Sequence, residues 1–226
     1  NTIIGFTEIL SNQYFGTLNR RQSEYTRGVL EASQQLLALI DDILDLALIE
    51  SGHLELELAP TDVRVMLDSV VSLSRERARK RELALELDCA DELGNLVIDE
   101  RRIKQALFNL VSNAIKHTPP GGQITIAAAR ETDALMITVS DTGAGIAVGD
   151  RDRIFEKFER AADSEQHGGV GLGLALVKSF VDLHGGAVGL NSTLGHGTAV
   201  RITLPLDQDG SRLGPKISWT DPGAGI

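Results

Sequence analysis

The segment from Asn1 to Gly52 has a helical pattern of apolar positions. Between Tyr25 and Leu46 apolar residues recur at alternating steps of four and three, which is the repeat of a coiled-coil seam. The seam consists of Tyr25, Val29, Ala32, Leu36, Leu39, Ile43 and Leu46. A second apolar strip beside it consists of Ile40, Leu44 and Ala47. A helix with two apolar strips needs more than one partner helix.

A break separates this helix from a shorter one before it. Gly16, in the run Phe15-Gly-Thr-Leu-Asn19, is a candidate helix C-cap. The pattern therefore predicts a first helix from Asn1 to about Phe15 and a second helix of about 30 residues. Such an unequal hairpin is stable only if chain upstream of Asn1 completes it or if a second copy packs on it. A homodimer with a four-helix bundle is the economical arrangement.

After Gly52 the pattern mixes strands with helices. Alternation predicts a strand over Leu54–Leu58, and a helix starts at about Val63 with Thr61 as its N-cap. A helix capped by Asp99 runs to about His117, and another follows Gly173 and ends at His184. The other predicted strands are Leu83–Leu87, Leu96–Ile98, the antiparallel pair Gln123–Arg130 and Leu135–Ser140, Ala187–Ser192 and Thr198–Leu206.

The predicted fold class is α+β, with a helical hairpin followed by an α/β sandwich. Hairpins replace the regular βαβ alternation that a Rossmann sheet requires. We expect the helical hairpin over residues 1–53, the sandwich over residues 54–206 and a loose tail over residues 207–226. The tail is rich in glycine, proline and aspartate and offers little apolar surface to bury.

Composition narrows the function classes. A formal net charge of −10 argues against nucleic-acid binding, which normally requires a basic surface. Cys89 is the only cysteine, so no internal disulfide or cysteine-based zinc site is possible, which fits the cytosol. We expect no membrane contact within this chain, because it has no apolar run of about 18 residues or more. The chain opens in mid-pattern without Met, as expected for a piece of a longer protein.

The helix from Asp99 to His117 carries an unusual polar face. Gln105, Asn109, Asn113 and Lys116 share one side of it, apart from the apolar stripe. That stripe consists of Ile103, Ala106, Leu107, Leu110, Val111 and Ala114. Asparagine is a poor helix former, so a ligand role competes with that of a plain exposed face. In the ligand role Asn113 offers an amide oxygen to Mg²⁺ and Lys116 neutralises a phosphate.

Three glycine-containing segments follow in order. Asp141 ends a strand before Gly143 and Gly145, where a carboxylate can accept a hydrogen bond from adenine and the glycines admit a purine. The run Gly168–Gly173 lacks the preceding strand of a dinucleotide fingerprint, and suits a mobile loop before a helix whose amides face phosphates. The run Gly195–Thr198 is either a hairpin turn or a ligand contact. Each segment also occurs in ordinary turns, but their joint order favours a nucleotide site.

Together these segments resemble the boxes of the histidine-kinase catalytic domain. That domain is part of the ATP-binding GHKL superfamily, with type II topoisomerases, Hsp90 chaperones and MutL repair proteins. The matching segments are the N box Asn109–Pro119, the G1 box Asp141–Ile146, the F box Ile154–Phe158, the G2 box Gly169–Ala175 and the G3 box Gly195–Thr198. The segment Ile40–Gly52 resembles the second helix of that family's dimerisation and phosphotransfer domain.

The resemblance implies a site for ATP and Mg²⁺. Asn113 would bind Mg²⁺ with Asn109 assisting around the phosphates, and these two with Lys116 would be the catalytic set. His117, Lys116 and Arg160 would contact phosphates or ribose. Asp141 would read the adenine amino group.

A lid over the nucleotide is also implied. It would span Glu159–His167, with Phe155 and Phe158 as aromatic pins that set it against the body. The remaining implied nucleotide contacts are Gly143, Gly145, Ile146, Phe158, Gly169, Gly171, Leu172, Gly173 and Thr198.

Position 109 separates kinases from ATPases in that superfamily. The ATP-hydrolysing branches resemble one another in placing Glu four residues before the magnesium-binding Asn, where it activates water as a general base. Asn109 occupies that position here and cannot take up a proton at neutral pH. Phosphoryl transfer in line to an imidazole is therefore favoured over hydrolysis by a stand-alone ATPase.

The acceptor of that phosphoryl group is not visible. The family's acceptor histidine lies in the first helix, whereas the five histidines here are His53, His117, His167, His184 and His196. The first hairpin, with Tyr14–Leu18, Glu24-Tyr25 and Leu36–Ser51, resembles the alphaproteobacterial cell-cycle group of PleC, DivJ and DivL, and this resemblance leaves two functions open. In the first, the phosphoryl group passes to an acceptor upstream of Asn1 and then to a response-regulator receiver domain. In the second, the chain is a DivL-like adaptor that binds a response regulator through the bundle without histidine phosphorylation. The resemblance also implies a full-length protein tethered to the inner membrane by upstream segments.

Overall fold

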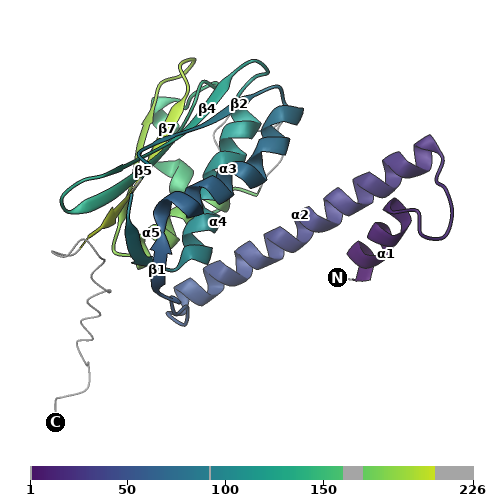
Figure 1. Cartoon of the computed structure of the whole chain (residues 1–226), viewed down its shortest axis with the longest axis horizontal. Coiled ribbons are helices and arrows are strands. Elements are labelled where there is room, and N and C mark those ends of the chain that lie inside the picture. Colours follow the sequence, from purple (N-terminus) through teal and green to yellow (C-terminus); the bar gives the residue numbers. More distant parts are fainter. Residues whose placement is uncertain (1, 92, 160–169, 207–226) are drawn as a thin grey trace, which may run out of the picture. The chain divides into compact units, whose positions relative to one another are not determined.

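The computed structural model describes residues 2–91, 93–159 and 170–206. The chain divides into two compact units, with the boundary between Leu54 and Glu55. The first unit is a helical hairpin in which α1 (Thr2–Ser11) packs on α2 (Arg20–Glu50). The second unit is a mixed α/β fold (Figure 1).

The start of α2 is set by a capping box. The side chain of Asn19 accepts a hydrogen bond from the backbone N–H of Gln22 at 2.9 Å, and Gln22 accepts one from Asn19 in return. The predicted end of the first helix was wrong, because α1 stops at Ser11 rather than near Phe15. The chain leaves the helix at Gln13, whose φ is 57°, so Gly16 lies beyond the helix end and is not its C-cap.

The predicted strand Leu54–Leu58 is not a strand. Its leucines are half-buried and its glutamates exposed, but the segment pairs with no neighbouring strand. The backbone N–H of Glu57 donates instead to a carboxylate oxygen of Asp99 at 3.0 Å. The alternation of apolar and polar residues therefore predicted correctly which side chains face inward. A strand would also have required a neighbouring strand to pair with.

The first strand of the second unit begins later and moves the next helix cap. β1 (Ala59–Asp62) includes Thr61, whose hydroxyl donates to the carbonyl of Ala59. The N-cap of α3 (Val63–Lys80) is therefore Asp62, which accepts from the N–H of Val65 at 3.0 Å, and not Thr61.

The sheet of the second unit has five strands. The remaining elements are β2 (Ala84–Cys89), β3 (Asn95–Ile98), α4 (Glu100–His117), β4 (Gln123–Arg130), β5 (Ala134–Asp141), η1 (Val148–Asp150), η2 (Arg153–Phe155), α5 (Gly173–Leu183), β6 (Ala187–Ser192) and β7 (Thr198–Pro205). The strand order is β2-β4-β5-β7-β6, in which only β2 and β4 pair in parallel. β1 and β3 form a separate antiparallel pair. This order confirms the mixed fold and excludes a Rossmann sheet.

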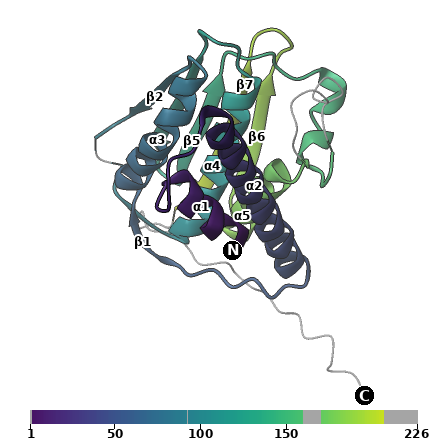
Figure 2. The same ribbon diagram turned by 90° about the vertical axis from the view of Figure 1, so that its right-hand side faces the viewer.

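Helices α3, α4 and α5 cover one face of the sheet, as Figure 2 shows. The inward residues of the central strands and the predicted apolar stripe of α4 are buried between these two layers. Asp99 caps α4 as predicted, accepting from the N–H of Arg102 at 3.1 Å. The core therefore holds the polar face of α4 in a defined orientation at the carboxyl end of β5.

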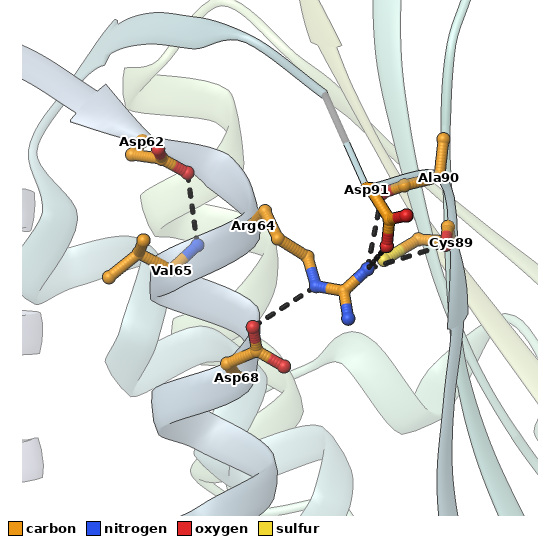
Figure 3. A network of polar contacts seen from close by, with 7 residues as sticks. All are labelled: Asp62, Arg64, Val65, Asp68, Cys89, Ala90 and Asp91. Carbon is orange, nitrogen blue, oxygen red and sulfur yellow. Dashed lines mark hydrogen bonds and ion pairs between the residues drawn. The ribbon is translucent and has the colours of Figure 1, made fainter.

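Arg64 links helix α3 to the end of the edge strand β2 through hydrogen bonds (Figure 3). Its guanidinium contacts Asp68 on α3 and the carbonyl of Ala90 just after β2, at 3.0 and 3.3 Å. Burial raises the pKa of the neighbouring Cys89 thiol, and Arg64 lowers it to a lesser degree. A thiol with a raised pKa is a poor nucleophile at neutral pH.

Candidate nucleotide site

The polar face of α4 forms one wall of the site. Gln105, Asn109, Asn113 and Lys116 are all half-buried rather than fully solvated. Gln105 accepts a hydrogen bond from Arg102 at 3.2 Å, and the guanidinium of Arg102 lies over the ring of Phe180. Within the described parts of the chain the Asn113 side chain makes no hydrogen bond to protein. An amide oxygen in that position suits a hard cation such as Mg²⁺.

Asn109 joins the N box to the G2 box. Its Nδ2 donates to the carbonyl of Gly173, the first residue of α5, at 3.4 Å. A side chain on Gly173 would also lie against the Asn109 amide, at 3.6 Å. Helices α4 and α5 are thus in direct contact.

The end of α4 joins the N box to the G1 box. The carbonyl of His117 accepts from the N–H of Ala144 at 3.3 Å. A Cβ on Gly143 would lie 2.5 Å from that same carbonyl, so only glycine fits there. His117 itself is exposed, and Lys116 precedes it on the half-buried face.

Asp141 is held at the end of β5 by backbone donors. Its carboxylate accepts from the N–H of Gly143 at 2.8 Å and from the N–H of Thr198. Burial raises the pKa of Asp141, and these two N–H groups lower it to a lesser degree. The side chain is half-buried, so the charged form is partly desolvated and still has acceptor capacity for a ligand.

The G1 and G3 boxes interlock through glycines. The N–H of Gly195 donates to the carbonyl of Ala144 at 2.6 Å. Gly145 and Gly197 have φ values of 71° and 91°, and a Cβ on them would overlap the carbonyls of Thr193 and Asp141 respectively. Two glycines are therefore required by close backbone approach as well as by left-handed geometry.

Ser192 is a residue of this site that the sequence patterns did not single out. It is 2% exposed at the end of β6, and its Oγ accepts from the N–H of Ile146 at 2.8 Å. The sequence did contain a sign of this role. Ser192 follows Val188 and Leu190 on the inward face of β6, where another apolar residue would be expected.

The F and G2 boxes meet through a backbone hydrogen bond. The N–H of Phe158 donates to the carbonyl of Gly171 at 3.1 Å. Phe158 is 65% exposed with a φ of 63°, so its role as a pin stays a prediction, and Ile154 is the buried anchor of this segment. Leu172 is 3% exposed, and its contact with a nucleotide stays a prediction. Arg160 and Gly169 lie outside the described residues.

The described boxes therefore form one connected site. Asn109 reaches the G2 box, His117 reaches the G1 box, and Asp141 lies opposite Thr198 of the G3 box in the register of β5 and β7. The half-buried side chains of Asn109, Asn113 and Lys116 lie on this face of α4, and the carboxyl group of Asp141 lies at the end of β5. That arrangement suits a nucleotide with its base near Asp141 and its phosphates along α4.

Two family models match the chain. Residues 98–208 match the family of histidine kinase-, DNA gyrase B- and HSP90-like ATPases, and residues 1–52 match the His Kinase A (phospho-acceptor) domain. The site and the hairpin thus define a GHKL-type ATP-binding domain that follows a phospho-acceptor hairpin. The chain belongs to the sensor histidine kinases.

Known relatives agree with that family. The chain is 39% identical to the histidine protein kinase DivJ of Caulobacter vibrioides over 91% of its own length and 35% of DivJ. It is 35% identical to the sensor protein DivL of the same organism, over 96% of this chain and 28% of DivL. The crystal structure of full-length ShkA in complex with AMPPNP is similar with a TM-score of 0.74 and 32% identity, over 90% of this chain and 42% of that one.

The chain spans only part of the curated relatives that it matches. The share ranges from 21% to 41% of their length among the most similar ones. Among the described residues, no helix is long and apolar enough to cross a membrane.

Proposed function

We propose that this chain is a kinase core that binds Mg-ATP and transfers the γ-phosphoryl group to an acceptor residue upstream of Asn1. From there the group would pass to the receiver domain of a response regulator. The observation that carries the proposal is Asn109, which stands where a hydrolytic relative would carry a general base and whose amide is bonded to Gly173. Without a base to activate water, bound ATP is kept for transfer.

The donor set fits the proposed ligands. The Asn113 oxygen would coordinate Mg²⁺ together with phosphate oxygens, and Lys116 would offset phosphate charge. Bound Mg²⁺ would neutralise charge that develops on the transferring group. The carboxylate of Asp141 would accept from the amino group of adenine.

The proposed chemistry is a single in-line displacement. A ring nitrogen of the acceptor imidazole uses its lone pair to form a bond to the γ-phosphorus. The bond from that phosphorus to the bridging oxygen breaks, ADP leaves with the electron pair, and the imidazole releases its proton to solvent. The chain's contribution is positioning and charge neutralisation by Asn109, Asn113 and Lys116.

Titration of ATP in the presence of magnesium tests the site. We expect wild type to bind, and Asn113→Ala and Asp141→Ala each to weaken binding by tenfold or more, as about 1.4 kcal/mol or more per lost charged contact implies. Asn191→Ala, an exposed asparagine on β6, is the matched control and should bind like wild type. Absence of binding by wild type would overturn the proposal of a working kinase site.

The hairpin provides the proposed dimer contact. On α1 and α2 large apolar side chains are exposed in the single chain, among them Phe6, Leu36, Ile40 and Leu44 at 64%, 60%, 45% and 55%. Burying such a stripe against a second copy would form the four-helix bundle. The receiver domain would then dock on that bundle, and the full-length protein would work in the cytoplasm with upstream segments as its membrane tether.

The adaptor function remains the second candidate. It is favoured by the 35% identity to the sensor protein DivL. The natural chain extended upstream, incubated with Mg-ATP, separates the two. Phosphate incorporated at an upstream histidine supports the kinase, whereas binding of a receiver domain without any incorporation supports the adaptor.

A further inference from the structure

Three polar side chains form a row across the end of the sheet. In the strand register Asp141 of β5 lies opposite Thr198 of β7, and Thr198 lies opposite Ser192 of β6. All three share the face covered by helices, because Val139, Val200 and Leu190 precede or follow them by two residues on the same side. The row therefore links the adenine-reading carboxylate of the proposed function to a buried hydroxyl.

The hydroxyl of Ser192 is fully committed to protein groups. It accepts from the N–H of Ile146 at 2.8 Å and donates to the carbonyl of Gly197 at 2.9 Å. Its third neighbour is Oγ1 of Thr198, at 2.9 Å. A hydroxyl has one proton and two lone pairs, and a carbonyl can only accept. Since the single proton of Ser192 goes to Gly197, the hydrogen bond to Thr198 must be donated by Thr198.

This direction fixes what Thr198 can offer a ligand. Its only hydroxyl proton points to Ser192, so its remaining lone pairs can only accept. The carboxylate form of Asp141 can also only accept. Two adjacent acceptors favour a base that carries an amino group at the six position, as adenine does, and disfavour a carbonyl there, as in hypoxanthine or guanine. A site with a fixed hydrogen-bond direction rejects the wrong partner because a polar group is left unpaired.

We propose that Ser192 is a specificity-determining positioning residue, which selects six-aminopurine nucleotides by orienting the Thr198 hydroxyl. Ser192 acts through Thr198 and does not itself touch the base. The inference rests on the proposed ATP site and adds a determinant of base choice to it. A purely structural Ser192 would hold the G1 and G3 segments together without any effect on base preference.

Three triphosphates that differ only at the six position test this proposal. They are ATP with an amino group, inosine triphosphate with a carbonyl and purine riboside triphosphate with hydrogen, each titrated with magnesium. We expect Ser192→Ala to lower the preference of wild type for ATP over inosine triphosphate by about tenfold, the effect of one hydrogen bond. Ser192→Thr, which keeps a hydroxyl, should restore the preference. An unchanged preference in Ser192→Ala would overturn the proposal.

A second variant guards against loss of folding in Ser192→Ala. Thr198→Val leaves the bonds of Ser192 to Ile146 and Gly197 in place and removes the oriented acceptor. It should weaken ATP binding about tenfold relative to purine riboside triphosphate. The double variant should then show the base preference of Thr198→Val alone. If Thr198→Val keeps the wild-type preference, the proposal fails even though ATP binds. If wild type binds none of the three nucleotides, the proposed function fails and this inference with it.

Discussion

The backbone N–H of Asp99 donates to Nε2 of His184 at 3.0 Å, although the two residues are 85 positions apart in the chain. The other ring nitrogen of His184 lies 2.7 Å from the carbonyl of Phe180. Because a carbonyl can only accept, Nδ1 carries the ring proton and Nε2 is the acceptor. This contact joins the start of the N-box helix α4 to the end of α5. Asp99 also binds Glu57, so one residue connects both helices to the segment before β1.

Replacing His184 should destabilise the second unit. His184→Ala would leave the buried N–H of Asp99 without its acceptor and open a cavity at a fully buried position, which we expect to cost about 3 kcal/mol. Urea denaturation measures the change. His196→Ala, at an exposed turn, is the matched control and should stay within about 0.5 kcal/mol of wild type. Equal effects of the two substitutions would contradict this role of His184.

We expect ionisation of Asp141 to lower the folding stability of the ligand-free chain while it favours ATP binding. Burial raises its pKa in the folded state, so the native chain binds its proton more tightly than the unfolded chain does. As pH rises through the ordinary and then the raised pKa, the unfolded state loses the proton first and stability falls. Asp141→Asn should therefore stabilise the ligand-free chain at neutral pH, as measured by thermal unfolding, and remove this part of the pH dependence.

The affinity for ATP should depend on pH in the opposite direction to the folding stability. Binding requires the ionised carboxylate, so the affinity of wild type falls as pH drops through the raised pKa of Asp141. The dependence of ATP affinity on pH in Asp141→Asn contains the titration of ATP itself. The difference between the wild-type and variant profiles therefore gives the contribution of the Asp141 carboxyl group. Parallel profiles would show that Asp141 does not read the base.

Asn109→Glu should introduce ATP hydrolysis. A carboxylate at this position of α4 can act as a general base, a role that contributes about 10²- to 10⁴-fold in enzymes with optimised geometry. Because the contact to Gly173 is lost as well, we expect at least a severalfold rise in steady phosphate release without an acceptor. Asn109→Gln has the same length without a base and should show no rise. A rise in both variants would point to general loosening of the site.

Substitutions of the two glycines of the G3 turn would distinguish the effect of backbone strain from that of steric overlap. Gly195 and Gly197 have φ values of 79° and 91°, but only at Gly197 would a Cβ meet backbone atoms, those of Asp141 and Thr142. Gly195→Ala should cost about 1 kcal/mol of unfolding free energy through its left-handed conformation alone. Gly197→Ala should cost clearly more and also weaken ATP binding, as thermal unfolding and titration would show. Equal losses of unfolding free energy in the two variants would mean that the backbone of the turn moves to accommodate the Cβ at position 197.

Leu36 should contribute to self-association of the hairpin. Leu36→Glu places a charge in the proposed seam and should shift the chain from dimer towards monomer in analytical ultracentrifugation. Leu73→Glu is the matched control, because Leu73 is a similarly exposed leucine on α3 of the other unit, at 66% against 60%. A monomeric wild type, or dissociation by both variants, would contradict the hairpin as the dimer contact.

Much of the architecture could be predicted from local patterns. The 31-residue length of α2, the Asp99 cap and the buried stripe of α4 follow from periodicity and capping chemistry, which act over a few residues. The predicted strand before β1 was wrong because a distant partner decided the outcome. Leu54–Leu58 alternates like a strand, but the N–H of Glu57 donates to the side chain of Asp99, the N-cap of α4, and the segment pairs with none of the described strands.

The sequence by itself determined the order of the boxes and the absence of a carboxylate at position 109. Those are properties of residue type and spacing, and no fold can change them. Only the tertiary structure decided that Ser192 bonds to Thr198 and Ile146, and that His184 accepts from Asp99. The direction of a hydrogen bond depends on which groups meet in space. Strand register and helix packing bring those groups together from distant parts of the chain.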